Sequence, residues 1–192
     1  MKYIIMADGQ GKRWNNYKNI PKHLIRIKGE TLLEHTVKLV KKYDPKSEVI
    51  ITSHDPRYEI EGAVRYEPQN NILEIDRFTR ELIEDNICFL YGDTYYTDTA
   101  MRRIVFEESE DLLFFGTKKS IVAIKVADSS VFRTHVDNVR SLYLKGEIEH
   151  CIGWQVYQSF MGLPFDEKKI DGNYVYLEDS TQDFNTPDDL EQ

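Results

Sequence analysis

Hydrophobic residues occur along the chain in short runs of strand length that alternate with amphipathic stretches. Strands are expected in order at 2–7, 48–52, 63–66, 87–91, 112–115, 121–126 and 174–177. Helices are expected at 31–43, 72–85, 98–109 and 147–161, and a short turn follows Pro187. This order is typical of a mainly parallel sheet with helices on its faces. The pattern therefore predicts a single α/β domain, a three-layer sandwich around a mainly parallel mixed sheet.

The helix at 31–43 has the best-defined start. Thr31 and Glu34 are spaced as a capping box, and Leu32, Leu33, Leu39 and Val40 supply an apolar face. Further along the chain, Trp154, Tyr157 and Phe160 lie at packing distance from one another on the helix expected at 147–161. We expect these aromatic residues in the core, with an acceptor lid or a dimer surface as the alternative.

Composition limits the class of protein. The 192 residues suit one domain, and 41% hydrophobic with 30% charged residues describe a globular chain. With 33 acidic against 25 basic residues and no dense basic stripe, nucleic acid is not an expected partner. No apolar run approaches the roughly 20 residues of a membrane span, and no signal peptide is evident, so we expect a cytoplasmic protein without a membrane partner. Cys88 and Cys151 are expected to be buried thiols.

The loop after the first strand combines glycines with cations. Gly9 and Gly11 allow backbone angles that let adjacent N–H groups converge on an anion, and Lys12 and Arg13 add positive charge. These features suit a triphosphate, although a plain turn with surface charges explains the loop equally well.

Two familiar phosphate loops do not fit this segment. Trp14 stands where a dinucleotide fingerprint needs its third glycine, and no Ser or Thr follows Lys12 as a P-loop requires.

Further on, Pro21 fixes the backbone before Lys22 and could aim that ammonium into the same cleft. His23 is the one histidine expected near this cleft.

Three blocks together resemble the nucleotidyltransferase signature of sugar-phosphate and related transferases. They are Ala7-Asp8-Gly9-Gln10-Gly11-Lys12-Arg13, Pro21-Lys22-His23-Leu24 and Gly29-Glu30-Thr31-Leu32-Leu33-Glu34. The match is specific because the three blocks occur in order within residues 7–34. The resemblance implies a Rossmann-like, GT-A nucleotidyltransferase type of fold. It also implies that Arg13 and Lys22 are catalytic and that the nucleotide is bound by Ala7, Asp8, Gly9, Gly11, Lys12 and Arg13.

Two aspartates stand where this family holds its metal. Asp93 follows Gly92 at the end of the strand expected at 87–91, and Asp183 opens the segment Asp183-Phe184-Asn185-Thr186-Pro187. By itself Asp93 is better explained as a cap of the next helix. The resemblance implies that Asp93 and Asp183 are ligands of Mg²⁺, a cation that prefers oxygen donors beside phosphates.

Two further positions bear on the nucleotide. Asn70 and Asn71, just before Ile72, resemble the base-proximal segment of phosphocholine-type cytidylyltransferases, which implies cytosine; a polar cap for the helix at 72–85 is the alternative. Asp8 departs from the family, which has alanine or glycine there. Its carboxylate could turn away from the phosphates, bind the base or ribose, or reach the metal.

The activity implied by the resemblance is Mg²⁺-dependent transfer of a nucleoside monophosphate, with CMP favoured, from a triphosphate to a phosphorylated small molecule. Pyrophosphate is released, and the product would be an activated precursor for surface polysaccharide or a similar polymer. Within the single domain, we expect residues 1–110 to bind the nucleotide, 111–182 to bind the acceptor, and 183–192 to supply a metal ligand. The sequence is compatible with a homodimer as well as a monomer. The alternatives are a GT-A glycosyltransferase, a molybdenum-cofactor guanylyltransferase and a non-catalytic nucleotide-binding regulatory homologue.

Overall fold

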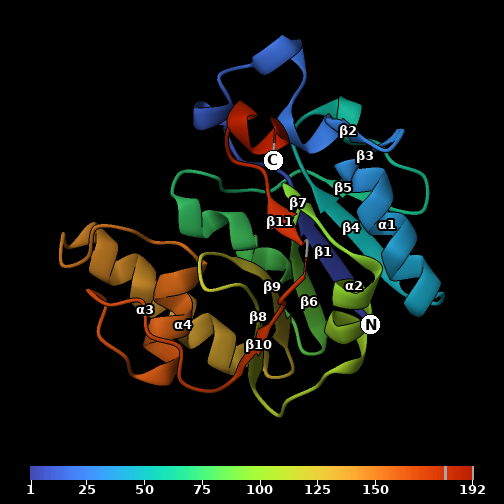
Figure 1. Cartoon of the computed structure of the whole chain (residues 1–192). Coiled ribbons are helices and arrows are strands. Elements are labelled where there is room, and N and C mark those ends of the chain that lie inside the picture. Colours follow the sequence, from blue (N-terminus) through green and yellow to red (C-terminus); the bar gives the residue numbers. More distant parts are fainter. Residues whose placement is uncertain (180, 192) are drawn as a thin grey trace.

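The computed structural model describes residues 1–179 and 181–191, and its centre is a seven-stranded sheet (Figure 1). The strands are β1 (Lys2–Met6), β4 (Glu48–Thr52), β5 (Val64–Tyr66), β6 (Ile87–Tyr91), β8 (Leu112–Gly116), β9 (Ile121–Val126) and β10 (Tyr174–Tyr176). Their order across the sheet is β10-β8-β9-β6-β1-β4-β5. Strand β9 runs antiparallel to β6 and β8, and the other neighbouring pairs are parallel. The predicted mainly parallel mixed sheet is therefore confirmed.

Helices cover both faces of the sheet. Helices α1 (Leu32–Tyr43) and α2 (Asp98–Phe106) pack on one face, and α3 (Ser129–Leu144) and α4 (Gly153–Met161) pack on the other (Figure 1). Successive residues of β1 point to opposite faces, so Tyr3 joins the α1–α2 core while Ile4 joins the α3–α4 core, both fully buried. Burial on both faces explains why the strand is a continuous apolar run. The three-layer prediction is confirmed.

The capping box at the start of α1 is present. The Glu34 backbone N–H donates to Thr31 Oγ1 at 3.1 Å, and the Thr31 backbone N–H donates to Glu34 Oε2 at 2.8 Å. The helix extends to Tyr43, as its periodicity predicts.

The helix predicted at 72–85 is wrong. The chain forms two short 3₁₀ turns there, Glu74–Phe78 and Arg80–Leu82, separated by Thr79 in the left-handed region at φ 51°. A β-branched residue at positive φ interrupts helical hydrogen bonding. The apolar residues of the segment, including Ile75 and Phe78, are nevertheless buried, so the pattern indicated burial correctly and the backbone wrongly.

The helix predicted at 147–161 is only partly correct. Helix α4 begins at Gly153, and a longer helix that was not predicted, α3, begins after its N-cap Asp128. Phe132, Val136 and Val139 follow helical spacing on the buried face of α3, so a periodic signal was present.

Two short strand pairs lie outside the main sheet. They are β2 (Arg26–Ile27) with β3 (Glu30–Thr31), and β7 (Thr94–Tyr95) with β11 (Gln182–Asp183), both antiparallel. The remaining 3₁₀ turns are Lys12–Trp14, Tyr17–Asn19, Lys22–Leu24, Pro56–Tyr58 and the C-terminal Pro187–Glu191. None of the helices within the described ranges has the length and apolar character needed to cross a bilayer.

Two aromatic residues of α4 and both cysteines are buried. Trp154 is 4% exposed and Tyr157 is fully buried, which confirms the core interpretation for both. Tyr96 is also buried, and its hydroxyl donates to the Val122 carbonyl oxygen, so it is a structural residue. Cys88 and Cys151 are buried free thiols, as predicted.

Candidate active site

The loop after β1 is anchored to the neighbouring strand. Ala7 is 2% exposed, and its N–H donates to the Thr52 carbonyl oxygen at 3.2 Å. Gly11 lies in the left-handed region at φ 60°, where a side chain would be strained. At Gly9 an added Cβ would lie 3.5 Å from the Arg77 guanidinium carbon. The loop therefore leaves the sheet edge with its backbone close to an arginine that the sequence did not single out.

Gly92 brings the end of β6 against this loop. Its N–H donates to the Met6 carbonyl oxygen at 2.9 Å, and an added Cβ would lie only 2.5 Å from that same oxygen. Any other residue would push the two strand ends apart. Glycine at this position thus places Asp93 at the carboxyl edge of the sheet, beside the first loop.

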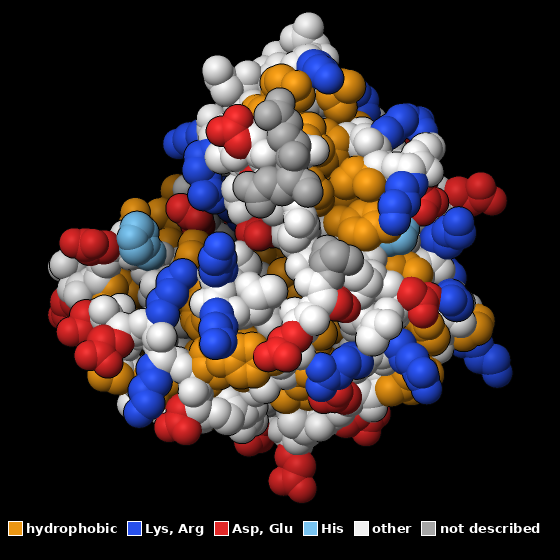
Figure 2. All heavy atoms as spheres, in the orientation of Figure 1, with side chains coloured by type: hydrophobic (Ala, Val, Ile, Leu, Met, Phe, Trp, Pro, Cys, Tyr) orange, Lys and Arg blue, Asp and Glu red, His pale blue; other side chains and the backbone are white. Residues whose placement is uncertain are grey.

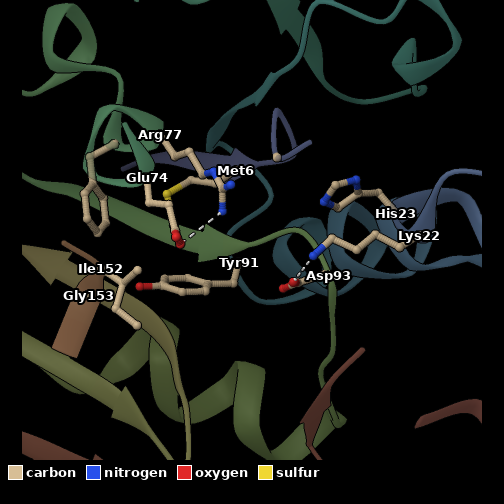
Figure 3. A pocket seen from close by; sticks show the side chains of 11 residues that line it. Met6, Lys22, His23, Glu74, Arg77, Tyr91, Asp93, Ile152 and Gly153 are labelled. Atoms are coloured by element: carbon tan, nitrogen blue, oxygen red, sulfur yellow. Dashed lines mark hydrogen bonds and ion pairs between the residues drawn. The ribbon is translucent and has the colours of Figure 1, made fainter. Parts of the chain in front are cut away.

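Lys22 and Asp93 form an ion pair at this edge. The ammonium lies 2.6 Å from Asp93 Oδ2, and the two side chains are only 12% and 16% exposed. Figure 3 shows them pointing toward one another beside His23. The alternative in which Asp93 caps the next helix is wrong, because Thr97 is the N-cap of α2 and accepts from the Ala100 N–H.

Asp183 reaches the same place from the far end of the chain. Strand β11 pairs with β7 so that Asp183 lies opposite Thr94, and the Phe184 N–H donates to the Asp93 carbonyl oxygen at 2.7 Å. Ser120 Oγ donates to Asp183 Oδ2 at 3.1 Å. The fold therefore brings together two aspartates that are far apart in sequence: Asp93 lies just before β7, and Asp183 lies on its partner β11.

The C-terminal segment also contacts the first loop. Arg13 donates to Asn185 Oδ1 at 3.1 Å, and Asn185 donates through its amide to Asp183 Oδ2. Asp189 Oδ2 accepts from the backbone N–H groups of Asn185 and Thr186, so this acid holds the final turn. Asn185, which this turn fixes, thus links Arg13 to Asp183 through its side chain.

Comparison with solved structures identifies the architecture. The CTP:phosphocholine cytidylyltransferase LicC of Streptococcus pneumoniae superposes with a TM-score of 0.60 at 17% identity, covering 99% of this chain and 96% of that one. The inositol-1-phosphate CTP transferase of T. maritima also gives 0.60, at 14% identity, covering 98% and 91%. The chain has the nucleotidyltransferase fold.

Sequence comparison adds a match over part of the chain. Bifunctional GlmU proteins of Francisella tularensis match, one from subspecies novicida at 27% identity over 123 residues, which is 58% of this chain, and one from subspecies holarctica at 39% over 105 residues, which is 48% of it. The chain spans about a quarter of the length of these relatives, 26% and 22% respectively. No family model matches. The chain therefore resembles the nucleotidyltransferase superfamily both in fold and in part of its sequence.

Asp8, the departure from the superfamily pattern, is turned toward the loop after β4. Its Oδ1 accepts the His54 backbone N–H at 2.9 Å, and its Oδ2 lies 2.7 Å from His54 Nδ1. The carboxylate also accepts from Asn71. Asp8 thus links three segments of the nucleotidyltransferase fold, which is a role that the sequence alone did not indicate.

Asn71 has its amide orientation fixed by Asp8. Its Nδ2 donates to the Asp8 carbonyl oxygen at 2.7 Å and to Oδ2 at 2.9 Å. Both partners are acceptors, so reversing the amide would lose both bonds, and Oδ1 is the polar atom left for a ligand. Asn71 lines the cleft, whereas Asn70 lines a separate hollow with Asp76, Arg80 and Asp137. The structure therefore separates two residues that the sequence treated as a pair. Neither caps the following turn, Glu74–Phe78, whose N-cap is Leu73.

His23 is a buried residue next to Lys22 at the site. It is 3% exposed, and its Nδ1 lies 2.9 Å from the Tyr58 hydroxyl. Burial, with a smaller contribution from the Lys22 ammonium, lowers the pKa of His23 to about 3. The ring is consequently neutral at physiological pH and packs beneath Lys22 instead of titrating there.

Two residues near the first loop were not identified from the sequence, His54 and Arg77. His54 follows β4, a parallel strand whose carboxyl end lies at the same edge as those of β1 and β6, so strand order was a usable signal. Arg77 lies on the 3₁₀ turn that was predicted as a helix, and nothing in the sequence indicated its approach to Gly9.

The cleft itself extends from the first loop to the start of α4 and has a volume of about 620 Å³. Beyond the first loop its lining includes Ile152, Trp154, Gln155 and Lys168. Figure 2 shows lysine and arginine side chains gathered in a band on this face, between the lobe with the first loop and the part with α3 and α4. The cleft thus has two walls, one from the first half of the chain and one from residues 150–168.

Proposed function

We propose that this chain is a Mg²⁺-dependent nucleotidyltransferase that transfers CMP from CTP to a phosphorylated small molecule and releases pyrophosphate. The observation that carries the proposal is the convergence of Lys22, Asp93 and Asp183 at one edge of the sheet, beside a glycine-containing basic loop. The fold and the partial sequence match are consistent with it.

The reaction needs charge neutralisation and alignment more than proton transfer. A phosphate oxygen of the acceptor attacks the α-phosphorus, a new P–O bond forms there, and the bond from the α-phosphorus to the bridging oxygen breaks as pyrophosphate leaves. The attacking oxygen is already anionic at neutral pH, so no general base is required. The first loop with Lys12 and Arg13 would bind the leaving pyrophosphate, and Lys22 would neutralise the phosphates that approach each other.

Asp93 and Asp183 would hold the magnesium ion. They are hard oxygen donors whose backbones are joined by the Phe184 N–H to Asp93 carbonyl hydrogen bond, and each has one carboxylate oxygen, Oδ1, outside the side-chain hydrogen bonds described above. Two carboxylates together with substrate phosphates are a donor set that suits Mg²⁺. The described residues contain no group of three or more His, Cys, Asp or Glu side chains gathered for a metal, so the remaining ligands would be phosphate oxygens and water. When bound, the ion would stabilise negative charge on the phosphates.

The preference for cytosine is supported by Asn71. The atom it offers to a ligand is the acceptor Oδ1, which pairs with an amino group. Cytosine carries an amino group at the position where uracil carries an oxygen. The product would be a CDP-linked compound, the type of activated precursor from which surface polysaccharides and similar polymers are built.

The proposal is tested by pyrophosphate release. The full chain is incubated with Mg²⁺, each of the four ribonucleoside triphosphates and a panel of phosphorylated sugars, polyols and amino alcohols. We expect release that depends on both substrates and on Mg²⁺, with CTP the best donor. Absence of release with every combination would refute the enzymatic proposal, and equal release with UTP would refute the base preference.

A further inference from the structure

The cleft has an uneven charge, although the whole chain is acidic with a net charge of −8. Among the described residues, its lining holds five lysine and arginine side chains and one carboxylate, that of Glu74. Glu74 Oε2 lies 3.9 Å from Arg77 Nη1, so part of its charge is already balanced. Four of the basic residues belong to the first half of the chain and face the proposed triphosphate. The fifth, Lys168, lies on the opposite wall.

Lys168 is held over an aromatic ring on that wall. Its Nζ lies 5.0 Å from the centroid of the Trp154 ring and donates to the Lys119 carbonyl oxygen at 3.3 Å. Trp154 Nε1 donates to the same carbonyl at 3.2 Å, and its ring stacks on Tyr174 at 5.8 Å. The indole is therefore fixed in the core, and its π surface is already occupied by the protein's own cation.

This arrangement bears on two chemical classes of acceptor that the proposed function leaves open: phosphorylated amino alcohols, and phosphorylated sugars or polyols. A quaternary ammonium binds to the free face of an aromatic ring, often beside carboxylates. Here Lys168 takes the place of such a ligand cation and would repel it. Glu74, the one carboxylate that lines the cleft among the described residues, is paired with Arg77. An ammonium donor in this position matches instead a group of hydroxyl or carboxylate oxygens.

We propose that the acceptor is a phosphorylated polyol or sugar whose oxygens bind Lys168, and that phosphorylated amino alcohols such as choline phosphate are rejected. The inference rests on the proposed function, in that it names the acceptor for the same cleft. It departs from LicC, whose fold this chain shares but whose name specifies phosphocholine. Lys168 is thereby a specificity-determining residue on the acceptor wall.

The test compares two acceptors of similar size, glycerol 3-phosphate and choline phosphate, with the full chain, CTP and Mg²⁺. Binding is measured by calorimetry with a non-hydrolysable CTP analogue, and turnover by pyrophosphate release. We expect glycerol 3-phosphate to bind at least about tenfold more tightly, equivalent to about 1.4 kcal/mol. Choline phosphate binding as well or better, or no binding of either compound, would overturn the inference.

Lys168→Met removes the charge and keeps most of the side-chain length. We expect it to raise KM for glycerol 3-phosphate about tenfold, leave KM for CTP unchanged, and increase affinity for choline phosphate by freeing the indole. Lys169→Met, at an exposed neighbour outside the cleft lining, is the matched control and should behave as wild type. An unchanged acceptor preference in Lys168→Met would refute the assignment.

The two proposals fail in different ways. If glycerol 3-phosphate binds through Lys168 but no pyrophosphate is released with any donor, the enzymatic proposal fails, and the assignment of Lys168 as a binding residue for phosphorylated polyols stands. If pyrophosphate is released with choline phosphate as the preferred acceptor, the enzymatic proposal stands and the acceptor assignment fails.

Discussion

The two walls of the cleft are built on different physical principles. On the nucleotide wall, polar side chains from distant parts of the chain pair with one another: Lys22 with Asp93, and Asp8 with His54 and Asn71. On the acceptor wall, Trp154 belongs to the apolar core and a single cation, Lys168, lies over it. The first wall is held by separate groups of paired polar side chains, and the second has one cation lying over an aromatic ring of the core.

Substitutions in the two walls should therefore have different effects. Where polar side chains pair with one another, removing one member leaves its partners unpaired. On the acceptor wall a single substitution changes one interaction and leaves the supporting core intact. We therefore expect substitutions on the nucleotide wall to reduce turnover or stability, and substitution of Lys168 to change substrate choice.

The largest effect is expected at the two aspartates. Asp93→Asn or Asp183→Asn removes a charge proposed to hold Mg²⁺ and should lower turnover by on the order of a hundredfold to a thousandfold. The measurement is kcat from pyrophosphate release, with circular dichroism to show that the fold is kept. Asp98→Asn, an exposed aspartate on α2, is the control. Turnover within a fewfold of wild type in Asp93→Asn would exclude it as a metal ligand.

The second effect concerns stability and the neutral His23. Its pKa is about 3 in the folded protein against 6.5 as the reference value, so between these values the unfolded chain binds the extra proton. Stability from this residue is therefore present above pH 6.5 and is lost as pH falls toward 3. Between pH 7 and pH 5 the expected loss is about 2 kcal/mol.

The measurement is urea unfolding at both pH values. His23→Gln cannot titrate and can keep a hydrogen bond to Tyr58, so its stability should fall less than that of wild type over this range. His150→Gln, at an exposed histidine on the acceptor wall, should follow wild type. An equal fall in wild type and His23→Gln would show that His23 is not the source of the pH dependence.

The contrast between the walls also explains what could be predicted from the sequence. The strands and α1 were predictable because buried runs and a capping box are local signals, and the first loop, Lys22 and Asp93 were identified because they lie in contiguous blocks. Whether these residues act as proposed stays a prediction. The bonds of Asp8 to His54 and Asn71 were not predictable, since they join residues that are 46 and 63 positions apart.

The errors of secondary structure have similar causes. Residues 72–85 have an apolar pattern compatible with a helix, but Thr79 adopts a left-handed conformation that only the tertiary packing determines. Arg77 was missed for this reason, because its approach to Gly9 depends on the 3₁₀ turn. Gly92, by contrast, was recognised as part of a motif, but its need for a close approach to Met6 became evident only with the sheet order.

The third prediction uses the separation of Asn71 from Asn70. Asn71→Ala removes the fixed acceptor and should reduce the preference for CTP over UTP by about tenfold, roughly 1.4 kcal/mol. Asp8→Asn should give a change in the same direction, because an amide at position 8 lets Asn71 reverse its own amide and offer a donor. Asn70→Ala, in the separate hollow, is the control and should keep the preference. Loss of preference in Asn70→Ala but not in Asn71→Ala would reverse the assignment.

The smallest effect is expected at Asn185, which connects the network to the C-terminal turn. It accepts from Arg13 at 3.1 Å, donates to Asp183 and lines the cleft. Asn185→Ala removes hydrogen bonds that position two proposed active-site groups without removing either charge, so kcat should fall about threefold to tenfold. Asn185→Asp keeps the acceptor for Arg13 but places a carboxylate beside Asp183, and the added repulsion should make it worse than Asn185→Ala. KM for the acceptor should be unchanged in both, because the acceptor wall is not involved. A larger effect on that KM than on kcat would mean that the C-terminal turn contacts the acceptor, and the two walls would then not be independent.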